Sequence, residues 1–364
     1  MANADSADII VFAPALNGQT ITLTSGSIGF SHMGLTIDAT ALDSLIINSG
    51  DSSRVFYIQH ASPVYLRGVT FKNGYSISGG GAIRFFGSGT NAFIESCIFR
   101  NNHADGEGGA IYTNYSNVTI SESIFENNTA GISGGAITNS RANVLIQSCA
   151  IINNSASWGG GAIHSEGYTS SFSGTVSVAV TNMENCTVSG NASPRGGALF
   201  CADTGAININ YCTITDNDAS LWGGGMYLIS DHHAYLTHTI LAGNTSAGDA
   251  DFSTSQRRVH SNGYNVIGDH IDPWFGIPAG SPNANNDYVG TTANPMDPLL
   301  HPLEIYGGAT PTHALQSGSP AHNNGASTSS VITDQRGSQR PDGSTDTDIG
   351  AFEAVSYTHL RAHE

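Results

Sequence analysis

The chain has 364 residues and a net charge of −17, with Lys72 as its one lysine. Because few basic groups are present to displace counterions from phosphates, neither a nucleic acid nor an anionic membrane surface is expected as a partner. Only 11% of residues are charged and 44 are glycine, a composition that favours short strands and tight turns over helices. No run of about 18 apolar residues occurs, so no transmembrane helix is predicted.

Residues 1–60 are predicted to hold the N-terminal strands and the first coils of a repeating fold. The strand-like run from Ile9 to Phe12 begins almost at once, and no signal peptide precedes it. We therefore expect that the natural start of the protein lies upstream of Met1.

Glycine pairs followed by a small or apolar residue recur through residues 61–254. The steps between them are 28, 26, 26, 36 and 28 residues. The longest step contains an insertion near residues 167–174, which we expect to form a surface loop. A recurring period of this kind is typical of a solenoid, in which each repeat stacks on the next. The pairs are Gly80-Gly81, Gly108-Gly109, Gly134-Gly135, Gly160-Gly161, Gly196-Gly197 and Gly224-Gly225.

A second marker precedes each pair and consists of a large apolar residue, two others and an asparagine, as in Phe99 to Asn102. Each repeat also contains an alternating stretch such as Asn117-Val118-Thr119-Ile120, which has the period of a strand. One strand after the glycine pair, one in the alternating stretch and one at the apolar marker give three short strands per coil, with no room for a helix. The sequence therefore predicts an all-β fold, a right-handed parallel β-helix with a repeat of about 26 residues.

Equivalent residues of successive coils lie on top of each other in a β-helix, about 4.8 Å apart. The asparagines of the second marker are therefore expected to form an amide ladder, and the glycine pairs to provide backbone freedom at a corner. Both features are interpreted as structural. The predicted ladder consists of Asn102, Asn128, Asn154, Asn191, Asn217 and Asn244.

Four cysteines share another column, two residues before the apolar marker, and Ser123 fills this column in the repeat that lacks a cysteine. A ladder of small interior side chains is the favoured interpretation. A disulfide between Cys186 and Cys212 is the alternative, because the coil spacing approaches the Cα separation that a disulfide requires. The odd number of cysteines and their spacing argue against zinc. The column consists of Cys97, Cys149, Cys186 and Cys212, and Cys201 lies outside it.

The strand after each glycine pair is expected to alternate between inward and outward residues. Tyr112 and His164 are outward residues that carry chemistry, and Glu166 lies on the same side of its strand as His164. A histidine and a glutamate on one face could act as acid and base. Ordinary variation of a surface is the alternative. The predicted outward column is Arg84, Tyr112, Thr138, His164, Phe200 and Leu228.

Trp158 and Trp222 each lie three residues before the second glycine of a pair, with Pro194 in the same column between them. Two coils should place the tryptophans about 10 Å apart. Flat aromatic side chains on a polar surface can stack on sugar rings. Covering a corner of the coil is the alternative.

Two further groups of residues could hold a metal ion. In Asp231-His232-His233, adjacent strand residues point to opposite faces, which favours a turn or surface role over metal binding. Asp249 and Asp251 are expected to share a strand face and could bind Ca²⁺, which suits an acidic, asparagine-rich surface. No other cofactor is expected.

The glycine-pair and Phe-x-x-Asn repeats resemble those of the polymorphic outer-membrane protein family, which are surface β-helices. The first segment also resembles the start of secreted β-helix proteins that carry a CSLREA motif, although the motif itself is absent. This resemblance extends from Ala2-Asn3-Ala4-Asp5 to Gly18-Gln19-Thr20-Ile21-Thr22-Leu23.

Residues 255–354 resemble the choice-of-anchor Q domain, which ends exported proteins just before a cell-surface anchoring signal. One departure is Ala321-His322-Asn323-Asn324-Gly325, where the family has Ala-Ile-Asp-x-Gly. The resemblance implies export and display, without implying one activity. The matching motifs, in order, are Asp297-Pro298-Leu299-Leu300, Gly307 to Leu315, Gly318-Ser319-Pro320-Ala321, Asp334-Gln335-Arg336-Gly337 and Asp348 to Glu353.

The last ten residues, 355–364, resemble the translation of a transposase-based sequencing adapter and are left out of the predicted fold. We therefore expect a secreted or cell-surface-anchored protein of bacterial type whose signal peptide and anchor are both missing from this chain. The sequence names neither the anchor type nor the ligand.

The catalytic motifs of two families of β-helix enzymes are missing. Polygalacturonase-like hydrolases use Gly-His-Gly and Arg-x-Lys, and pectate-lyase-like enzymes use a basic residue beside Ca²⁺-binding carboxylates. The first hypothesis is therefore a monomeric, non-catalytic surface protein, adhesin-like or glycan-binding, whose partner is a carbohydrate or a neighbouring cell surface. The second is a polysaccharide lyase or glycoside hydrolase that uses the groove around Tyr112, His164 and Glu166.

Overall fold

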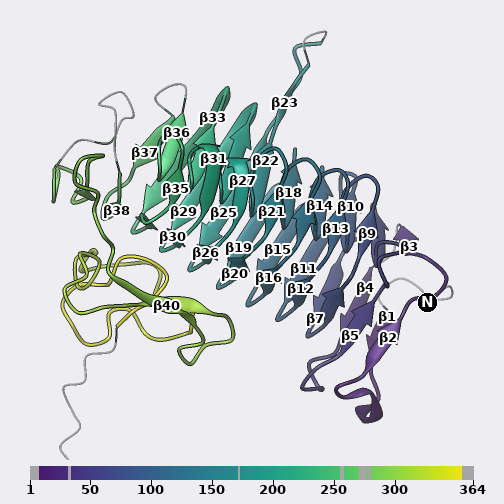
Figure 1. Ribbon diagram of the computed structural model, residues 1–364. Helices are drawn as coiled ribbons and strands as arrows, with labels where there is room; N and C mark the ends of the chain where they lie inside the picture. Colours follow the sequence, from purple (N-terminus) through teal and green to yellow (C-terminus); the bar gives the residue numbers. More distant parts are fainter. Residues whose placement is uncertain are drawn as a thin grey trace, which may run out of the picture.

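The computed structural model describes residues 8–31, 34–170, 173–254, 258–269, 277 and 280–354. These residues form a solenoid of parallel strands with a loop-rich tail folded against one side (Figure 1). The prediction of an all-β parallel β-helix is confirmed. Within the described ranges one short 3₁₀ turn occurs, η1 (Pro14–Leu16), and no helix could cross a bilayer. The adapter-like residues 355–364 lie outside these ranges.

Four parallel sheets, named A to D, run along the solenoid. Sheet A, from the alternating stretches, contains β1 (Asp8–Val11), β4 (Leu35–Asp38), β7 (Val64–Arg67), β11 (Asn91–Glu95), β15 (Asn117–Ser121), β19 (Asn143–Gln147), β25 (Ala179–Glu184), β29 (Thr204–Asn210), β33 (Asp231–Thr237) and β37 (Val259–Ser261). Sheet B, from the apolar markers, contains β2 (Thr20–Thr22), β5 (Ile46–Asn48), β8 (Thr70–Lys72), β12 (Ile98–Arg100), β16 (Ile124–Glu126), β20 (Ala150–Ile152), β26 (Thr187–Ser189), β30 (Thr213–Thr215), β34 (Ile240–Leu241), β38 (Val266–Ile267) and β39 (Tyr288–Val289).

The other two sheets flank the glycine pairs. Sheet C follows the pairs and contains β3 (Ile28–Ser31), β6 (Phe56–Gln59), β10 (Ile83–Phe86), β14 (Ile111–Asn114), β18 (Ile137–Ser140), β22 (Ile163–Glu166), β28 (Leu199–Ala202), β32 (Met226–Leu228) and β36 (Phe252–Thr254). Sheet D precedes the pairs and contains β9 (Tyr75–Ser76), β13 (His103–Ala104), β17 (Thr129–Ala130), β21 (Ser155–Ala156), β27 (Ala192–Arg195), β31 (Asp218–Trp222) and β35 (Thr245–Ser246).

Sheet D corrects the prediction of three strands per coil, because each regular repeat contributes a fourth. Strands of two residues, such as β13, are too short to show alternation in the sequence. The insertion near residues 167–174 forms an antiparallel hairpin of β23 (Tyr168–Thr169) and β24 (Val176–Ser177), which projects from the solenoid (Figure 1). Its residues 171–172 lie outside the described ranges.

The solenoid core consists of the inward residues of sheets A, B and C. Phe71, Phe99 and Phe125 stack in consecutive coils with ring centroids 5.0 and 4.6 Å apart. All three side chains are fully buried, and burying a phenylalanine is worth about 1.5–3 kcal/mol. Stacked identical residues therefore fill the centre of the rod in these coils.

The predicted asparagine column forms a continuous amide ladder. In each coil the backbone N–H and the side-chain Nδ2 donate to the Oδ1 of the next asparagine, as Asn128 does to Asn154 at 2.9 Å in both cases. The Nδ2 also donates to a backbone carbonyl of the preceding coil. The ladder begins where the Gly74 N–H donates to Asn102, and it ends where Asn244 donates twice to the buried carboxylate of Asp251.

The cysteine column forms a second, weaker ladder. The backbone N–H of Cys97 donates to Ser123 Oγ at 3.1 Å, and further along the Thr239 N–H donates to Asn265 Oδ1. This ladder also ends in a buried carboxylate, because Asn265 donates from both nitrogens to Asp287. All five cysteines are buried free thiols, so the alternative of a disulfide between Cys186 and Cys212 is not realised.

The predicted boundary between solenoid and tail at residue 254 is too early. Strands β37, β38 and β39 belong to the segment 255–354, yet they extend sheets A and B. The repeat is hard to see there because this segment contains no glycine pair in register. The tail begins after β39, and its hairpin of β40 (Leu300–Glu304) and β41 (Thr312–Leu315) is antiparallel.

The tail packs on the outer side of sheet B. Thr187 of β26 donates to the Gln335 side chain at 2.6 Å, and the Ala351 N–H donates to Thr213 of β30 at 3.0 Å. A small joint core contains residues of both parts. Solenoid and tail therefore share one packed interface. The residues of this joint core are Ile240, Ala242, Val266, Ala321 and Ile349.

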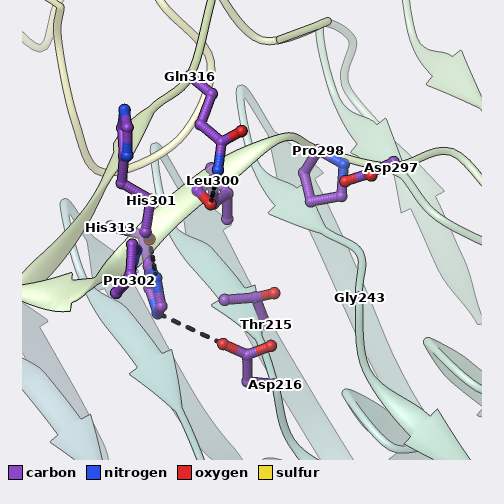
Figure 2. A pocket seen from close by; sticks show the side chains of 10 residues that line it. All are labelled: Thr215, Asp216, Gly243, Asp297, Pro298, Leu300, His301, Pro302, His313 and Gln316. Carbon is purple, nitrogen blue, oxygen red and sulfur yellow. Dashed lines mark hydrogen bonds and ion pairs between the residues drawn. The ribbon is translucent and has the colours of Figure 1, made fainter.

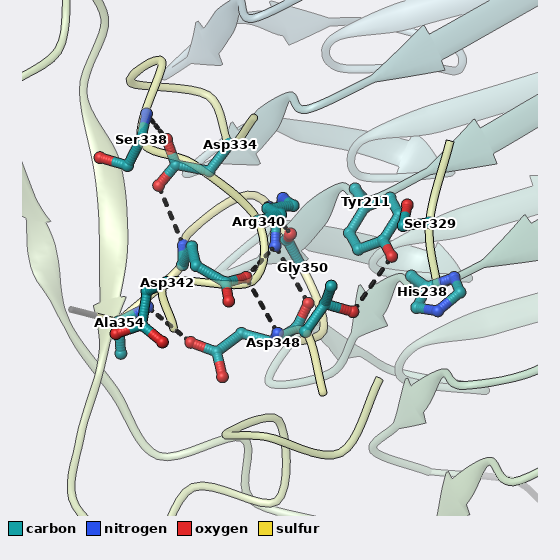
Figure 3. A network of polar contacts seen from close by, with 12 residues as sticks. Tyr211, His238, Ser329, Asp334, Ser338, Arg340, Asp342, Asp348, Gly350 and Ala354 are labelled. Carbon is teal, nitrogen blue, oxygen red and sulfur yellow. Dashed lines mark hydrogen bonds and ion pairs between the residues drawn. The ribbon is translucent and has the colours of Figure 1, made fainter. Parts of the chain in front are cut away.

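Arg340 is the centre of the polar network inside the tail (Figure 3). Its fully buried guanidinium forms an ion pair with Glu353 at 2.8 Å and donates to the backbone carbonyl of Gly350. It also lies 4.4 Å from the centre of the Tyr211 ring of the solenoid. Losing one partner of a buried ion pair leaves the other charge uncompensated. Arg340 therefore has a structural role, because it joins the Glu353 carboxylate of the tail to the Tyr211 ring of the solenoid.

Replacing Asn154 by alanine should lower the free energy of unfolding by about 3 kcal/mol. The change removes the acceptor of two buried donors of Asn128, and an unpaired buried donor costs about 1–3 kcal/mol. The matched control is Asn143→Ala in the exposed row where Asn143 donates to Asn117, which should change stability by no more than about 0.5 kcal/mol. Urea unfolding of both variants measures the difference, and equal losses would contradict a ladder that stabilises the fold.

We predict that the packing of the tail on the solenoid loses stability in acid because of His238. Its ring stacks between Tyr211 and Tyr264, and its Nε2 accepts the Ala326 N–H at 3.0 Å. Burial, with Arg340 nearby, lowers the pKa of His238 to about 4. The neutral ring therefore contributes stability that is complete above the unfolded pKa near 6.5 and is lost as the pH falls toward 4.

The melting temperature of His238→Gln should accordingly fall less steeply between pH 6.5 and 4 than that of the wild type. Thermal melts at several pH values measure the slope. The exposed His322 of the same tail provides the control, and His322→Gln should keep the wild-type slope. A variant His238→Gln with an unchanged slope would contradict the assignment.

Candidate functional site

The outward face of sheet C carries the candidate site. The strand register places Arg84, Tyr112, Thr138, His164 and Phe200 one above the other, as predicted. The sixth member is Tyr227 and not Leu228, which points into the core. The error arose in the triplet Gly223-Gly224-Gly225, where Gly223 takes the left-handed corner position (φ 63°) that the prediction gave to Gly224.

A second column covers this face and consists of the residues before each glycine pair. A Cβ atom at Gly79 would lie 3.1 Å from the Tyr112 ring, and one at Gly159 would lie 2.6 Å from the Phe200 ring. At these two positions glycine therefore leaves room for the aromatic ring of the next coil. The column consists of Gly79, Glu107, Ser133, Gly159, Arg195 and Trp222.

Glu107 extends from this column to His164, two coils further along the solenoid. The intervening coil has short residues at both places, Ser133 and Thr138, and the Thr138 hydroxyl donates to the Ser133 carbonyl. Glu107 Oε1 lies 3.6 Å from His164 Nδ1, and Glu166 Oε2 lies 3.9 Å from His164 Nε2. The imidazole is thus flanked by one carboxylate on each side.

The His164 ring is 3% exposed and stacks on Phe200 with centroids 5.1 Å apart. Neither of its ring nitrogens has a hydrogen-bond partner. Burial, with His232 nearby, lowers the pKa of His164 to about 3, so the ring is neutral. The sequence predicted this histidine at the surface; the stacked Phe200 and the covering column explain why it is buried.

The two carboxylates are only partly buried, yet both are perturbed. Burial raises the pKa of Glu107 to about 7, with a further contribution from Glu166. Burial also raises the pKa of Glu166, while a hydrogen bond from the Ser140 hydroxyl opposes this effect. Burial is the main reason that the pKa of Tyr112 is raised as well. Perturbed groups of this kind are typical of functional sites and also of structural networks.

Two arginines lie near the cluster formed by Glu107, His164 and Glu166. The Arg84 guanidinium lies 5.1 Å from the centre of the Tyr112 ring, and the Arg141 guanidinium lies between the rings of Tyr115 and Tyr168 at 5.2 and 5.3 Å. A hollow of about 210 Å³ opens beside Glu107 and Tyr112. It is lined by Ser78, Gly79, Arg84, Gly106, Glu107, Tyr112 and Ile132.

Of the three residues singled out in the sequence, His164 and Glu166 lie side by side, and Tyr112 lies two coils before His164 in the same column. Sequence reasoning missed Glu107, because it lies outside the strand that was searched. One signal could have found it, since a glutamate stands where the neighbouring repeats have Gly79, Ser133 and Gly159. Glu107, His164 and Glu166 offer ligand atoms that all lie within 4.8 Å of one another and could hold a metal ion.

The two predicted tryptophans are 51% and 41% exposed, and an arginine joins them. The Arg195 guanidinium lies 4.0 Å from the centre of the Trp158 ring and 5.4 Å from that of Trp222. Trp222 also stacks on Tyr227 at 5.9 Å. The prediction placed Pro194 between the two tryptophans, but the residue found there is Arg195. The reason is the same glycine triplet, which shifts Trp222 into the column that contains Arg195. We name these four residues the aromatic ridge.

The sequence model of the family described as "Right handed beta helix region" matches residues 46–262, more than half of the chain. The chain belongs to this right-handed β-helix family. No curated protein and no solved structure matches it. Family membership and fold together support the predicted hand of the solenoid.

The strand face expected for Asp249 and Asp251 of the β-helix protein is not formed. Asp249 and Asp251 lie in no strand, so they share no strand face. Asp251 is buried, and its oxygens accept hydrogen bonds from Asn244 and from the Asp269 N–H. Asp251 therefore ends the amide ladder and offers no free oxygen pair to a cation.

The histidine pair after Asp231 also has a structural arrangement. His232 is fully buried and contacts the Ala202 carbonyl, while His233 lies on the other face and contacts His260 at 2.9 Å. The expectation that the two rings point to opposite faces agrees with this geometry.

A second hollow of the β-helix protein, about 360 Å³, lies between the β40–β41 hairpin and the outer side of sheet B (Figure 2). His313 borders it, but its Nδ1 contacts the His301 carbonyl at 2.8 Å and its Nε2 contacts Ser189 at 3.0 Å. Asp216 lies 3.9 Å from the same Nε2. Because His313 is engaged on both nitrogens, this hollow reflects docking of the tail.

Replacing His164 by phenylalanine should raise the free energy of unfolding of the β-helix protein by about 1 kcal/mol in chelator-treated buffer. Phenylalanine keeps the stack on Phe200 and removes two buried nitrogens that have no partner. The control is Thr138→Val in the next coil, which removes a satisfied hydrogen bond and should cost about 1 kcal/mol. Urea unfolding compares them, and a loss of stability in His164→Phe would contradict this account.

Proposed function

We propose that this chain is part of an exported, cell-surface β-helix protein that binds carbohydrate without turning it over. The observation that carries the proposal is the aromatic ridge, where two indole rings remain about half exposed on a polar surface. Large apolar groups that stay exposed together often mark an interaction site. The flat indole face suits the apolar face of a sugar ring, and its N–H can donate to a hydroxyl.

Arg195 supports this role because it holds the two indole rings in place. A side chain that is already ordered loses less conformational entropy on binding. The guanidinium also provides N–H donors for sugar hydroxyls or for the carboxylate of a uronic acid. The ridge follows the solenoid axis, so an extended glycan chain could contact successive coils.

The proposed cell-surface location is supported by the sequence resemblance of the tail to an anchor-type domain and by the regular rod that precedes it. A rigid rod with a ligand site on its side is suited to display away from an anchoring point. We propose that the protein acts as a monomer, with a carbohydrate or a neighbouring cell surface as its partner.

A polysaccharide lyase or glycoside hydrolase is the second candidate. It is favoured by the convergence of Tyr112, Glu107 and Glu166 in one place, with Arg84 and Arg141 at its border. Carboxylates and a phenol can transfer protons, and an arginine can bind a uronate. The hollow is smaller than the 300–1,000 Å³ usual for ligand pockets, so binding remains the first proposal.

Trp158→Ala and Trp222→Ala should each weaken binding of the best ligand on a glycan array at least tenfold. Each variant removes a stacking surface and frees Arg195. Ile332→Ala, which truncates an exposed apolar residue of the tail, is the control and should keep wild-type affinity. Isothermal titration with the array ligand measures the change, and unchanged affinity in both tryptophan variants would contradict the ridge as the site.

Incubation of the purified protein with uronic-acid polymers separates the two candidates. The binding proposal expects no new reducing ends and no absorbance from unsaturated products. Turnover that is lost in Tyr112→Phe would favour the enzyme instead.

A further inference from the structure

The imidazole of His164 is the most unusual buried group among the described residues. It is almost fully enclosed, and neither ring nitrogen has a hydrogen-bond partner. Buried polar groups are normally paired, because leaving one unpaired is unfavourable. Its two nitrogens instead face the carboxylates of Glu107 and Glu166 at 3.6 and 3.9 Å. These distances are too long for hydrogen bonds. One ion can bind only one of the two nitrogens, so the carboxylate on the other side of the ring has to turn toward that nitrogen.

We propose that Glu107, His164 and Glu166 bind a divalent transition-metal ion, with Zn²⁺ as the best match. The three ligand atoms lie within 4.8 Å of one another. Zinc bonds to histidine nitrogen and carboxylate oxygen are about 2.0–2.2 Å long, which places neighbouring ligand atoms of a tetrahedral site roughly 3.3 Å apart. Side-chain rotations of the two glutamates are sufficient to close this difference.

The chemistry of the donors selects the class of ion. Imidazole nitrogen is a preferred ligand of zinc and its neighbours in the first transition row, whereas Ca²⁺ and Mg²⁺ prefer oxygen alone. A neutral histidine with two carboxylates has a net charge of −2, which a divalent ion neutralises. The ion would also relieve the repulsion between Glu107 and Glu166.

The surroundings fit a bound ion that exchanges with solvent. Glu107 lines the hollow of about 210 Å³ together with Tyr112, so an ion and a water molecule have a route to the site. Ser140 donates to Glu166 Oε1, which leaves Oε2 facing the histidine. Metal-bound carboxylates are commonly held by such outer hydrogen bonds.

The small side chains of the coil between Glu107 and His164 are also consistent with this site. Ser133 and Thr138 leave room for Glu107 to extend past them, whereas a large side chain at either place would block the path. Elsewhere in the column Gly79 and Gly159 replace the glutamate, and the rings of Tyr112 and Phe200 fill the space beside them. The inference does not depend on carbohydrate binding by the ridge.

Zinc titration of chelator-stripped protein tests the proposal by isothermal calorimetry. We expect saturable binding of one ion per chain and a rise in melting temperature with zinc concentration. Glu107→Gln and Glu166→Gln keep the size of each side chain and remove a charged ligand, so each should weaken the affinity at least tenfold. Circular dichroism confirms that the variants are folded.

Surface histidines are the main source of adventitious zinc binding. Two control variants should keep the one-ion stoichiometry and affinity. His260→Ala breaks the His233–His260 pair, and His359→Ala/His363→Ala removes two histidines that lie outside the described residues. Cobalt provides a second readout, because a tetrahedral Co²⁺ site with nitrogen and oxygen ligands gives a visible absorption band that Glu107→Gln should abolish.

Three results would overturn the proposal. They are the absence of saturable binding in folded wild-type protein, unchanged affinity in both glutamate variants, and binding that disappears only in a surface-histidine variant. The failure of the ridge variants to affect glycan binding would leave the metal site standing, so the two proposals are distinguishable.

Discussion

The vertical hydrogen bonding between coils is the constraint on which the structure depends. Every strand of sheets A to D pairs in parallel with its counterpart one coil away, so each residue is held above an equivalent residue. The buried amide ladder fixes this register at one corner, because a slip by one position would leave its donors without acceptors. The stacked phenylalanines then fill the interior, since similar side chains meet at each level.

The same constraint explains how a regular fold can contain an irregular site. In-register stacking gives each outward residue a fixed position, and a single substitution in one column changes only the local surface. Glu107 replaces a glycine or serine, and the small Thr138 lets it extend to His164. Further along the same column Arg195 and Trp222 take the equivalent places, and Trp158 directly precedes Gly159 of this column. Both candidate sites therefore lie where a residue departs from the repeat. These departures occur in the outward column of sheet C and in the column that precedes the glycine pairs.

The sequence alone predicted the solenoid, the amide ladder and the shared outward column of Tyr112 and His164, because periodic residues translate directly into columns. It placed Tyr227 and Trp222 one column away from their true positions. In the triplet Gly223-Gly224-Gly225, either of the first two glycines could be assigned to the corner position from the sequence. Glu107 was missed because contacts across two coils depend on the size of the residues between them. The docking of the tail through Gln335 and Arg340 was not predicted, because it joins segments more than a hundred residues apart without periodicity.

The carboxylates at the ends of the two ladders give the rod a direction. Each asparagine both accepts from the coil before it and donates to the coil after it, so the chain of hydrogen bonds has the polarity of a filament. Asp251 and Asp287 accept but have no N–H on their side chains to pass on, and each therefore terminates its chain. A further coil, whether from another molecule or from an exchanged segment, would find no side-chain donor to continue either series.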